Sequence, residues 1–224
     1  MTIHRPGLPE DLPPAEVLWG RWALLAALEA TTEAEQDPPR HRTGRWLDDA
    51  GLHWDDCGCT WWVLSRCGPG RFVLYGEDEA SEVKWHEPKI DMLAGAPAWL
   101  PYPEIEHRLE GLEVGCVYWY ENGAWARAPY PDGLADDGLD CGVSCFTERA
   151  EVLGELADRL VDTADAADAD LLLADAEAHR LDPGRLPGLL APTDLDDEPL
   201  DLPAVLRALA RAGLTARPAT TDAS

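Results

Sequence analysis

Residues 54–78 read "WDDCGCTWWVLSRCGPGRFVLYGED", and this stretch decides the fold class. Segments 60–66 and 71–78 are rich in aromatic and β-branched residues, which favour β-strands. The "CGPG" between them is a turn sequence, so the two segments are predicted to form a β-hairpin. Ahead of them, "DDCGC" (55–59) combines Asp and Gly, which favour turns, with two small cysteines. We therefore expect a tight turn at 55–59 that leads into a strand beginning at Thr60.

A second hairpin is predicted farther along the chain. Residues 113–121 ("EVGCVYWYE") and 124–128 ("AWARA") flank Asn122 and Gly123. Asn-Gly between apolar segments is the strongest short hairpin signal, because both turn positions need positive φ. It is also the only asparagine in the chain. Two Trp-rich hairpins predict an antiparallel sheet.

Helical patterns lie on both sides of these hairpins. The expected helices cover residues 14–33, 103–111, 168–180 and 202–212, with a further one capped by Thr147. Asp201 and Gly213 are the expected cap and stop of the last helix. Residues 45–51 are expected to form one or two helical turns. The order of helix, strands and helices predicts an α+β fold, in which the sheet packs with an N-terminal helix and C-terminal helices.

The same pattern divides the chain into three parts. Residues 1–145 are expected to form the α+β core, 146–213 an acidic helical segment packed on that core, and 214–224 a disordered tail. Within the helical segment, residues 146–201 contain 16 acidic residues and four arginines. This stretch therefore carries about half of the net charge of the chain.

Composition limits the possible partners. The net charge is −25 and the pI is about 4.3. Such a field repels phosphate backbones, so we expect no nucleic-acid binding, and it favours basic proteins or cations. The most apolar run, Ala23–Leu28, is far shorter than the ~18 residues needed to span a bilayer. The N-terminus lacks the charged-then-apolar order of a signal peptide, so no membrane partner and a cytoplasmic location are expected.

Cysteines are the residues that most suggest a metal or thiol site. Cys57, Cys59 and Cys67 lie close in sequence, and Cys141 and Cys145 form a second pair. Their CxC and CxxxC spacings are looser than the CxxC pairs typical of structural zinc, so no metal or other cofactor is predicted. Placed two residues before an expected helix, Cys145 is expected to be an inert buried thiol or one that is somewhat acidified.

Successive side chains of a strand point to opposite faces, so the first hairpin places a tryptophan on each face of the sheet. Trp61 and Trp62 point to opposite faces, so one of them is expected in the core and the other partly exposed. The second face is either covered or forms an aromatic groove rimmed by carboxylates, which suits a basic side chain. The residues expected to bind a partner are Trp61, Trp62, Trp119, Trp125, Asp55, Asp56, Glu77 and Asp78.

The segment "WDDCGCTWW … CGPGRFVLYGEDEASEVKW" resembles part of uncharacterised actinobacterial proteins, in which an Asp/Gly-rich turn leads to a Trp strand and a Gly-Gly-Arg hairpin ending Leu-x-Gly-x-Asp. The 16 arginines against two lysines are also typical of a GC-rich genome. The resemblance covers roughly residues 54–85 and implies no activity. Cys57 and Cys59 replace glycines of those proteins, which argues further against a metal site.

Two classes of function remain open. The first is an acidic protein-binding module, for example an immunity-type inhibitor, that binds a basic partner surface. The second is a small hydrolase-type enzyme with a carboxylate or thiol site near the sheet end. The chain lacks the GxxxxGK[ST], GxSxG, HExxH and GxGxxG motifs, so no catalytic residue is predicted. A deep pocket that holds a carboxylate beside His53 or His86 would favour the enzyme.

Overall fold

The computed structural model describes residues 3–38, 41–193 and 198–215. In this part of the chain, a six-stranded antiparallel sheet has the order β1-β2-β3-β4-β5-β6, so each strand pairs with the next one along the sequence. The strands are β1 (Gly44–Leu47), β2 (Leu52–Asp55), β3 (Trp61–Gly68), β4 (Arg71–Glu77), β5 (Cys116–Glu121) and β6 (Ala124–Arg127). The expected antiparallel sheet is confirmed.

The helices precede, interrupt and follow the sheet. They are α1 (Ala15–Leu28), α2 (Thr32–Gln36), α3 (Tyr102–Glu110), α4 (Asp140–Thr147), α5 (Arg149–Ala157), α6 (Ala166–Glu177) and α7 (Leu202–Arg211). Short 3-10 turns lie at Pro9–Asp11, Val83–Trp85 and Leu186–Gly188. Together with the sheet, the N-terminal and C-terminal helices give the predicted α+β class.

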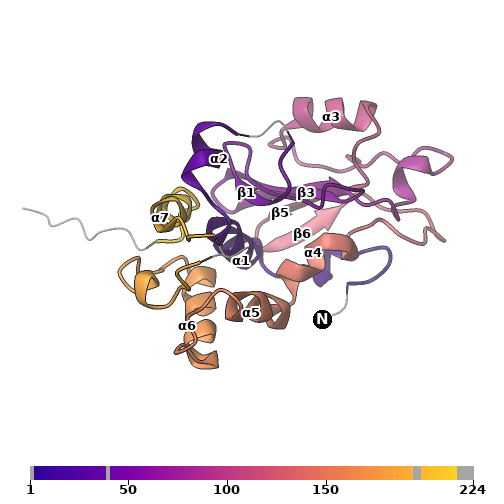
Figure 1. The fold of residues 1–224 in the computed structure, drawn as a ribbon. Helices are drawn as coiled ribbons and strands as arrows, with labels where there is room; N and C mark the ends of the chain where they lie inside the picture. The colour runs from indigo at the N-terminus through magenta and orange to yellow at the C-terminus, as the bar shows by residue number, and fades with distance from the viewer. Residues whose placement is uncertain (1–2, 39–40, 194–197, 216–224) are drawn as a thin grey trace, which may run out of the picture.

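Helix α1 is the centre of the larger core. Twelve of its 14 residues are buried, as expected for a helix that is apolar nearly all round. It lies between one face of the sheet and the helices α4 to α7 (Figure 1). Gly20 allows the closest helix contact, because a Cβ there would lie 2.6 Å from the Ala176 carbonyl oxygen of α6. The C-terminal helices therefore share one apolar cluster with α1 and the sheet.

The other face of the sheet is also largely covered. A second apolar cluster joins Val63, Val73 and Val117 of the strands to Ile105 of α3 and to the segment around Ile90. Helix α3 lies on the side of the sheet opposite α1 (Figure 1). The sheet is thus a middle layer between two apolar clusters.

Turn chemistry sets the second predicted hairpin and the predicted turn at 55–59. Asn122 and Gly123 have φ values of 56° and 84°, as the Asn-Gly turn between β5 and β6 requires. In the 55–59 turn, Cys57 takes a positive φ of 62°. The carboxylates of Asp55 and Asp56 accept the backbone N–H groups of residues 57 and 58, both at 2.7 Å. "DDCGC" is therefore a tight turn between two strands.

Three predicted elements differ from the structure. Residues 45–51 are not helical: they form β1 and the turn to β2, because pairing with β2 outweighs their weak local preference. Thr147 is not a helix cap but the last residue of α4, and its hydroxyl donates to the Ser144 carbonyl. Leu214 is fully buried in the predicted tail, and the remaining residues 216–224 lie outside the described part.

The predicted caps of the last helix are confirmed. The Asp201 side chain accepts the Ala204 N–H, and Gly213 has a φ of 71° just after α7. The helix presents its apolar residues Val205 and Leu209 to α1. Local capping rules are enough to place this helix, because its cap, stop and apolar stripe agree.

Candidate functional site

Three of the predicted partner-binding residues lie in one row across the sheet. Asp55 of β2 is directly opposite Trp61 of β3, and Trp61 is directly opposite Glu77 of β4. Residues paired in this way point to the same face and contact one another. This face is the one covered by α3, and the row lies at the end where the cover stops. The sheet register therefore brings an indole and two carboxylates together.

A cleft of about 450 Å³ opens over this row. We call it the aromatic cleft and define it by Asp55, Trp61, Glu77, Arg108, Leu112 and Glu113. Trp61 is partly exposed and packs edge-on against Tyr75, with ring centroids 6.1 Å apart. Leu112, just after α3, is one of the exposed large apolar residues of the described chain. The cleft thus combines an aromatic wall with an acidic rim.

Arg108 of α3 occupies the cleft. Its guanidinium carbon lies 5.0 Å from the centroid of the Trp61 ring, within the range of a cation–π interaction. It forms long ion pairs with Glu113 at 3.6 Å and Glu104 at 3.9 Å, and its side chain is 33% exposed. Exposed ion pairs of this kind stabilise by about 0–1 kcal/mol. A guanidinium is therefore held here weakly, over an aromatic ring and between carboxylates.

The two carboxylates of the row have different roles. Glu77 forms an ion pair with Lys84, and both side chains are largely buried. Burial lowers the pKa of Lys84. Asp55 accepts the Cys57 N–H at 2.7 Å and lines the cleft. Lys84 therefore neutralises one carboxylate, while Asp55 combines a structural role with a partly exposed position.

A carboxylate–histidine pair lies beside the aromatic cleft. His53 Nε2 is 2.8 Å from Asp48 Oδ1, and the His53 ring stacks on Trp46 with centroids 4.9 Å apart. Burial alone would raise the pKa of Asp48, but the hydrogen bond and charge of His53 lower it to about 2. The ring of His53 lines the same cleft as Asp55. Neither Asp48 nor Arg108 was predicted, because Asp48 lies in the turn of a β1–β2 hairpin whose first strand was expected to be helical, and Arg108 reaches the cleft from the distant helix α3.

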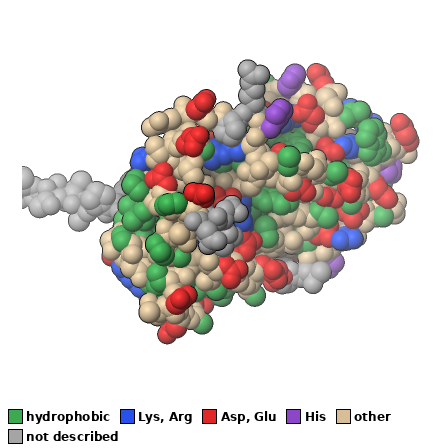
Figure 2. All heavy atoms as spheres, in the orientation of Figure 1, with side chains coloured by type: hydrophobic (Ala, Val, Ile, Leu, Met, Phe, Trp, Pro, Cys, Tyr) green, Lys and Arg blue, Asp and Glu red, His purple; other side chains and the backbone are tan. Residues whose placement is uncertain are grey.

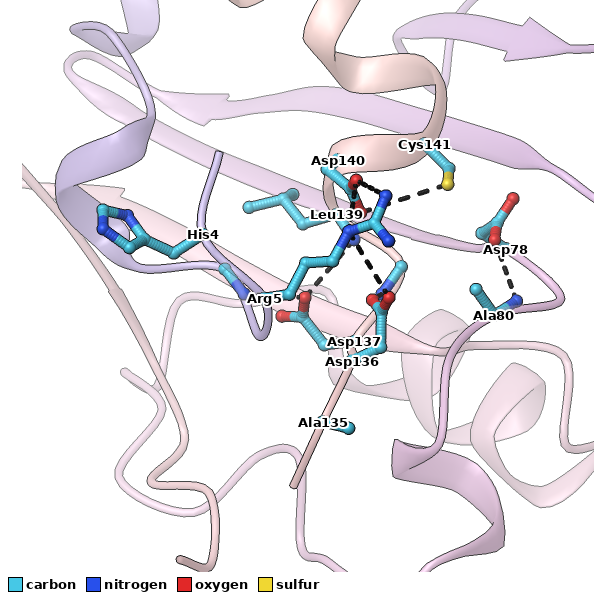
Figure 3. Close-up of polar contacts among 12 residues, drawn as sticks. His4, Arg5, Asp78, Ala80, Ala135, Asp136, Asp137, Leu139, Asp140 and Cys141 are labelled. Carbon is cyan, nitrogen blue, oxygen red and sulfur yellow. Dashed lines mark hydrogen bonds and ion pairs between the residues drawn. The ribbon is translucent and has the colours of Figure 1, made fainter. Parts of the chain in front are cut away.

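The other two predicted aspartates hold turns. Asp78 is buried and accepts the Thr60 hydroxyl at 2.5 Å. It also accepts the Ala80 N–H at 2.8 Å (Figure 3). Asp56 is exposed and accepts the N–H groups of Gly58 and Thr60. These hydrogen bonds fix the turn before β3 and the turn after β4. Neither residue lines the aromatic cleft.

The acids next to Asp78 also bind within the chain. In Figure 3 the Arg5 guanidinium points toward Asp136 and Asp140, with which it forms ion pairs. Asp137 is buried and accepts the Tyr118 hydroxyl at 2.7 Å and the Gly7 N–H at 2.9 Å. This cluster attaches the N-terminal arm to the sheet.

The remaining predicted tryptophans are buried. Trp62 is fully buried in the cluster around α1 and donates to the Cys141 carbonyl at 2.7 Å. Trp125 belongs to the same cluster and donates to the Pro13 carbonyl at 2.7 Å. Trp119 is buried in the cluster under α3 and pairs with Val73, away from the Asp55–Trp61–Glu77 row. One tryptophan of the Trp61–Trp62 pair is therefore core and the other partly exposed, as the alternation predicts.

Burial raises the pKa of several of the thiols. Cys145 lies inside α4, where its thiol donates to the Gly142 carbonyl and burial raises its pKa to about 12, so the expectation of an acidified thiol is wrong. Burial also raises the pKa of Cys141 to about 12 and of Cys67 to about 11. Cys57 and Cys59 are exposed. Among the described residues, no three His, Cys, Asp or Glu side chains gather where they could hold a metal ion.

Comparison of the chain with protein-family models, with curated proteins and with solved structures finds no match. Within the described residues, none of the helices combines the length and the apolar character that crossing a membrane requires. The clefts and charges of this chain are therefore the basis for a proposed function. Figure 2 shows acidic side chains spread over the visible face, with few basic ones between them.

Proposed function

We propose that the chain is a protein-binding module, in which the aromatic cleft takes a basic side chain from the surface of a partner protein. The observation that carries this proposal is the position of Arg108 over Trp61, 5.0 Å from the ring centroid and between carboxylates. This arrangement has the chemistry of a guanidinium site. A partner's arginine or lysine would displace Arg108, whose exposed ion pairs oppose displacement only weakly.

The charge of the whole chain supports the same partner chemistry. A net charge of −25 attracts basic surfaces over long range and raises their association rate. Leu112, 40% exposed at the rim, adds apolar contact next to the charged positions. A central aromatic residue with a polar rim is the usual composition of a binding hot spot. An inhibitor of a basic protein, of the immunity type, would have these properties.

The test uses the wild-type chain and two variants as baits for proteins of the host. Trp61→Ala removes the aromatic wall, and Leu171→Ala is the matched control, since Leu171 is 43% exposed on α6. We expect a basic protein to bind the wild type and the control but not Trp61→Ala. With the purified partner, Trp61→Ala should weaken binding by about 2 kcal/mol, or about 30-fold in Kd. A partner that binds Trp61→Ala and the wild type equally would refute the proposal.

One observation favours the alternative of a hydrolase-type enzyme. His53 lies beside Asp48 and lines the same cleft as Asp55, which is the combination of carboxylate and histidine that general acid–base chemistry needs. The thiol version of this alternative is disfavoured by the raised pKa of Cys141 and Cys145. Turnover of chromogenic ester, phosphate or glycoside substrates that is lost in His53→Gln would support the enzyme. No turnover with the wild type leaves the binding module as the better account.

A further inference from the structure

A second cleft of the described chain lies next to the aromatic cleft, and Trp46 and Asp55 line both of them. It has a volume of about 950 Å³, which is ample for a small molecule, and lies between α2, β1 and α7. Its apolar wall is made of alanines from α1 and α7, and its aromatic surface is Trp46. We call it the arginine cleft and define it by His41, Arg42, Trp46, Arg207 and Arg211.

The arginine cleft brings three arginines together in a chain with few basic residues, with Glu35, Asp48 and Asp55 also in its wall. Arg207 and Arg211 lie one turn apart on α7, and Arg42 precedes β1, so the three reach the cleft from two sides. Arg207 is held by Glu35 of α2 at 2.6 Å and by the Thr32 hydroxyl at 2.8 Å. The partner of Arg211 is Asp49, whose side chain is fully exposed. Such exposed pairs leave both guanidinium groups partly available to a ligand.

Arg42 differs from the other described arginines. Of the 14 described arginines, twelve form an ion pair with a carboxylate, and a thirteenth, Arg127, donates to two backbone carbonyls. No ion pair or hydrogen bond joins Arg42 to a residue that the structure describes. Its guanidinium carbon lies 5.3 Å from the centroid of the Trp46 ring, and burial lowers its pKa. The charges of Asp48, Glu29 and Glu35 act on Arg42 in the direction that raises its pKa, but none of them forms an ion pair with it, so the half-buried guanidinium can still take a direct anionic partner.

The acidic residues that line the arginine cleft already accept other hydrogen bonds. Glu35 is engaged by Arg207, and Asp48 accepts from His53 and from backbone N–H groups. Asp55 accepts the Cys57 N–H. The His53 ring stacks on Trp46, so Trp46 offers the cleft a flat aromatic surface that is held in place. The local arrangement thus favours an anion despite the acidic charge of the whole chain.

We propose that the arginine cleft binds a small organic anion that carries a carboxylate or phosphate group, with Arg42 as its main counter-ion. Arg207 and Arg211 flank the anion from α7, and Trp46 packs against its apolar part. A guanidinium gives such groups paired, charge-assisted hydrogen bonds, which a lysine would not. This proposal does not rest on the proposed binding of a basic partner, although Trp46 and Asp55 line both clefts, because its ligand has the opposite charge and contacts different arginines.

The test is calorimetric titration with two probes, citrate for carboxylates and inorganic phosphate for phosphates, at constant ionic strength. The wild type is compared with Arg42→Gln and with the control Arg185→Gln, an exposed arginine that pairs with Asp175. We expect saturable 1:1 binding of at least one probe, weakened about tenfold or more in Arg42→Gln and unchanged in the control. The probe that binds identifies the anionic group.

Two further results would overturn the anion site. One is the absence of saturable binding of both probes to the wild type, and the other is equal binding to Arg42→Gln. Arg207→Gln serves as a second variant and should weaken binding by a smaller factor, so the outcome does not depend on one substitution. Trp61→Ala should bind the anion like the wild type, which separates this site from the aromatic cleft.

Discussion

Replacing Trp62 and Trp61 one at a time should separate core from surface on adjacent residues. Trp62 is fully buried, and its indole N–H donates to the Cys141 carbonyl at 2.7 Å. Trp62→Ala therefore removes a complete core side chain and a buried hydrogen bond. Large-to-small changes of this kind cost about 3–5 kcal/mol. For a chain of this length each kcal/mol corresponds to about 2–4 °C, so Tm should fall by about 6–20 °C.

Trp61→Ala should lower the free energy of unfolding much less than Trp62→Ala does. Trp61 is partly exposed, and its ring contacts Tyr75 and Arg108 rather than the α1 cluster. The apolar area that it buries stabilises by about 1–2 kcal/mol, so Tm should fall by about 2–8 °C. Trp62→Phe should fall between the two, because it keeps most of the ring and leaves the Cys141 carbonyl without its donor, at a cost of about 1–3 kcal/mol.

The assay is urea denaturation followed by far-UV circular dichroism, with the free energy of unfolding taken from the midpoint and the slope of each transition. Equal losses in Trp61→Ala and Trp62→Ala would refute the reasoning, because they would mean that both faces of the sheet are covered to the same extent. The interaction surface would then have to be sought elsewhere on the acidic helices.

Three other predictions concern pH, thiols and salt. The pKa of Asp48 lies at about 2 in the fold and near ~3.9 in the unfolded chain, so its contribution to stability is present at pH 5 and is lost between about pH 4 and pH 2. Urea denaturation of Asp48→Asn and wild type should therefore converge over that range; a constant difference would contradict the His53 pairing. Alkylation at pH 7.5 followed by mass spectrometry should label exposed Cys57 first and fully buried Cys116 last, and early labelling of Cys116 would contradict its buried position. Moderate salt screens the repulsion between the acidic groups of residues 146–201, so Tm should rise between low salt and ~0.5 M NaCl rather than stay constant or fall.

The elements that the sequence predicts best are those set by local chemistry. Asn122-Gly123 fixes one hairpin, and Asp201 with Gly213 bounds the last helix, because these residues act on backbone groups within a few positions. β1 was missed, since its four residues form a strand only through pairing with β2 and packing on α1. A strand that depends on tertiary contacts leaves little trace in a short polar segment.

The candidate site could be predicted only in part, because local pairing places some of its residues and tertiary contacts place the others. Alternation placed Trp61 and Trp62 on opposite faces, and the hairpin brought Glu77 close to Trp61. Arg108 could not be predicted, because it reaches the cleft from α3, whose position depends on the whole second cluster. Asp78 was assigned to the rim because it is charged, whereas the fold uses it to bind Thr60. The sequence alone does not distinguish a turn carboxylate that accepts hydrogen bonds within the fold from one that binds a partner.

The most direct test of the central claim observes the Trp61 indole itself. A ¹⁵N-labelled sample gives separate side-chain N–H signals for the ten tryptophans, and Trp61→Phe assigns the relevant one. We expect a peptide GRGRG to shift the Trp61 signal saturably while the buried Trp62 signal stays in place. Arg108→Gln should bind this peptide more tightly, because it removes the competing guanidinium, and GEGEG should have no effect. An unmoved Trp61 signal, or equal shifts with both peptides, would contradict the proposed docking of a basic side chain.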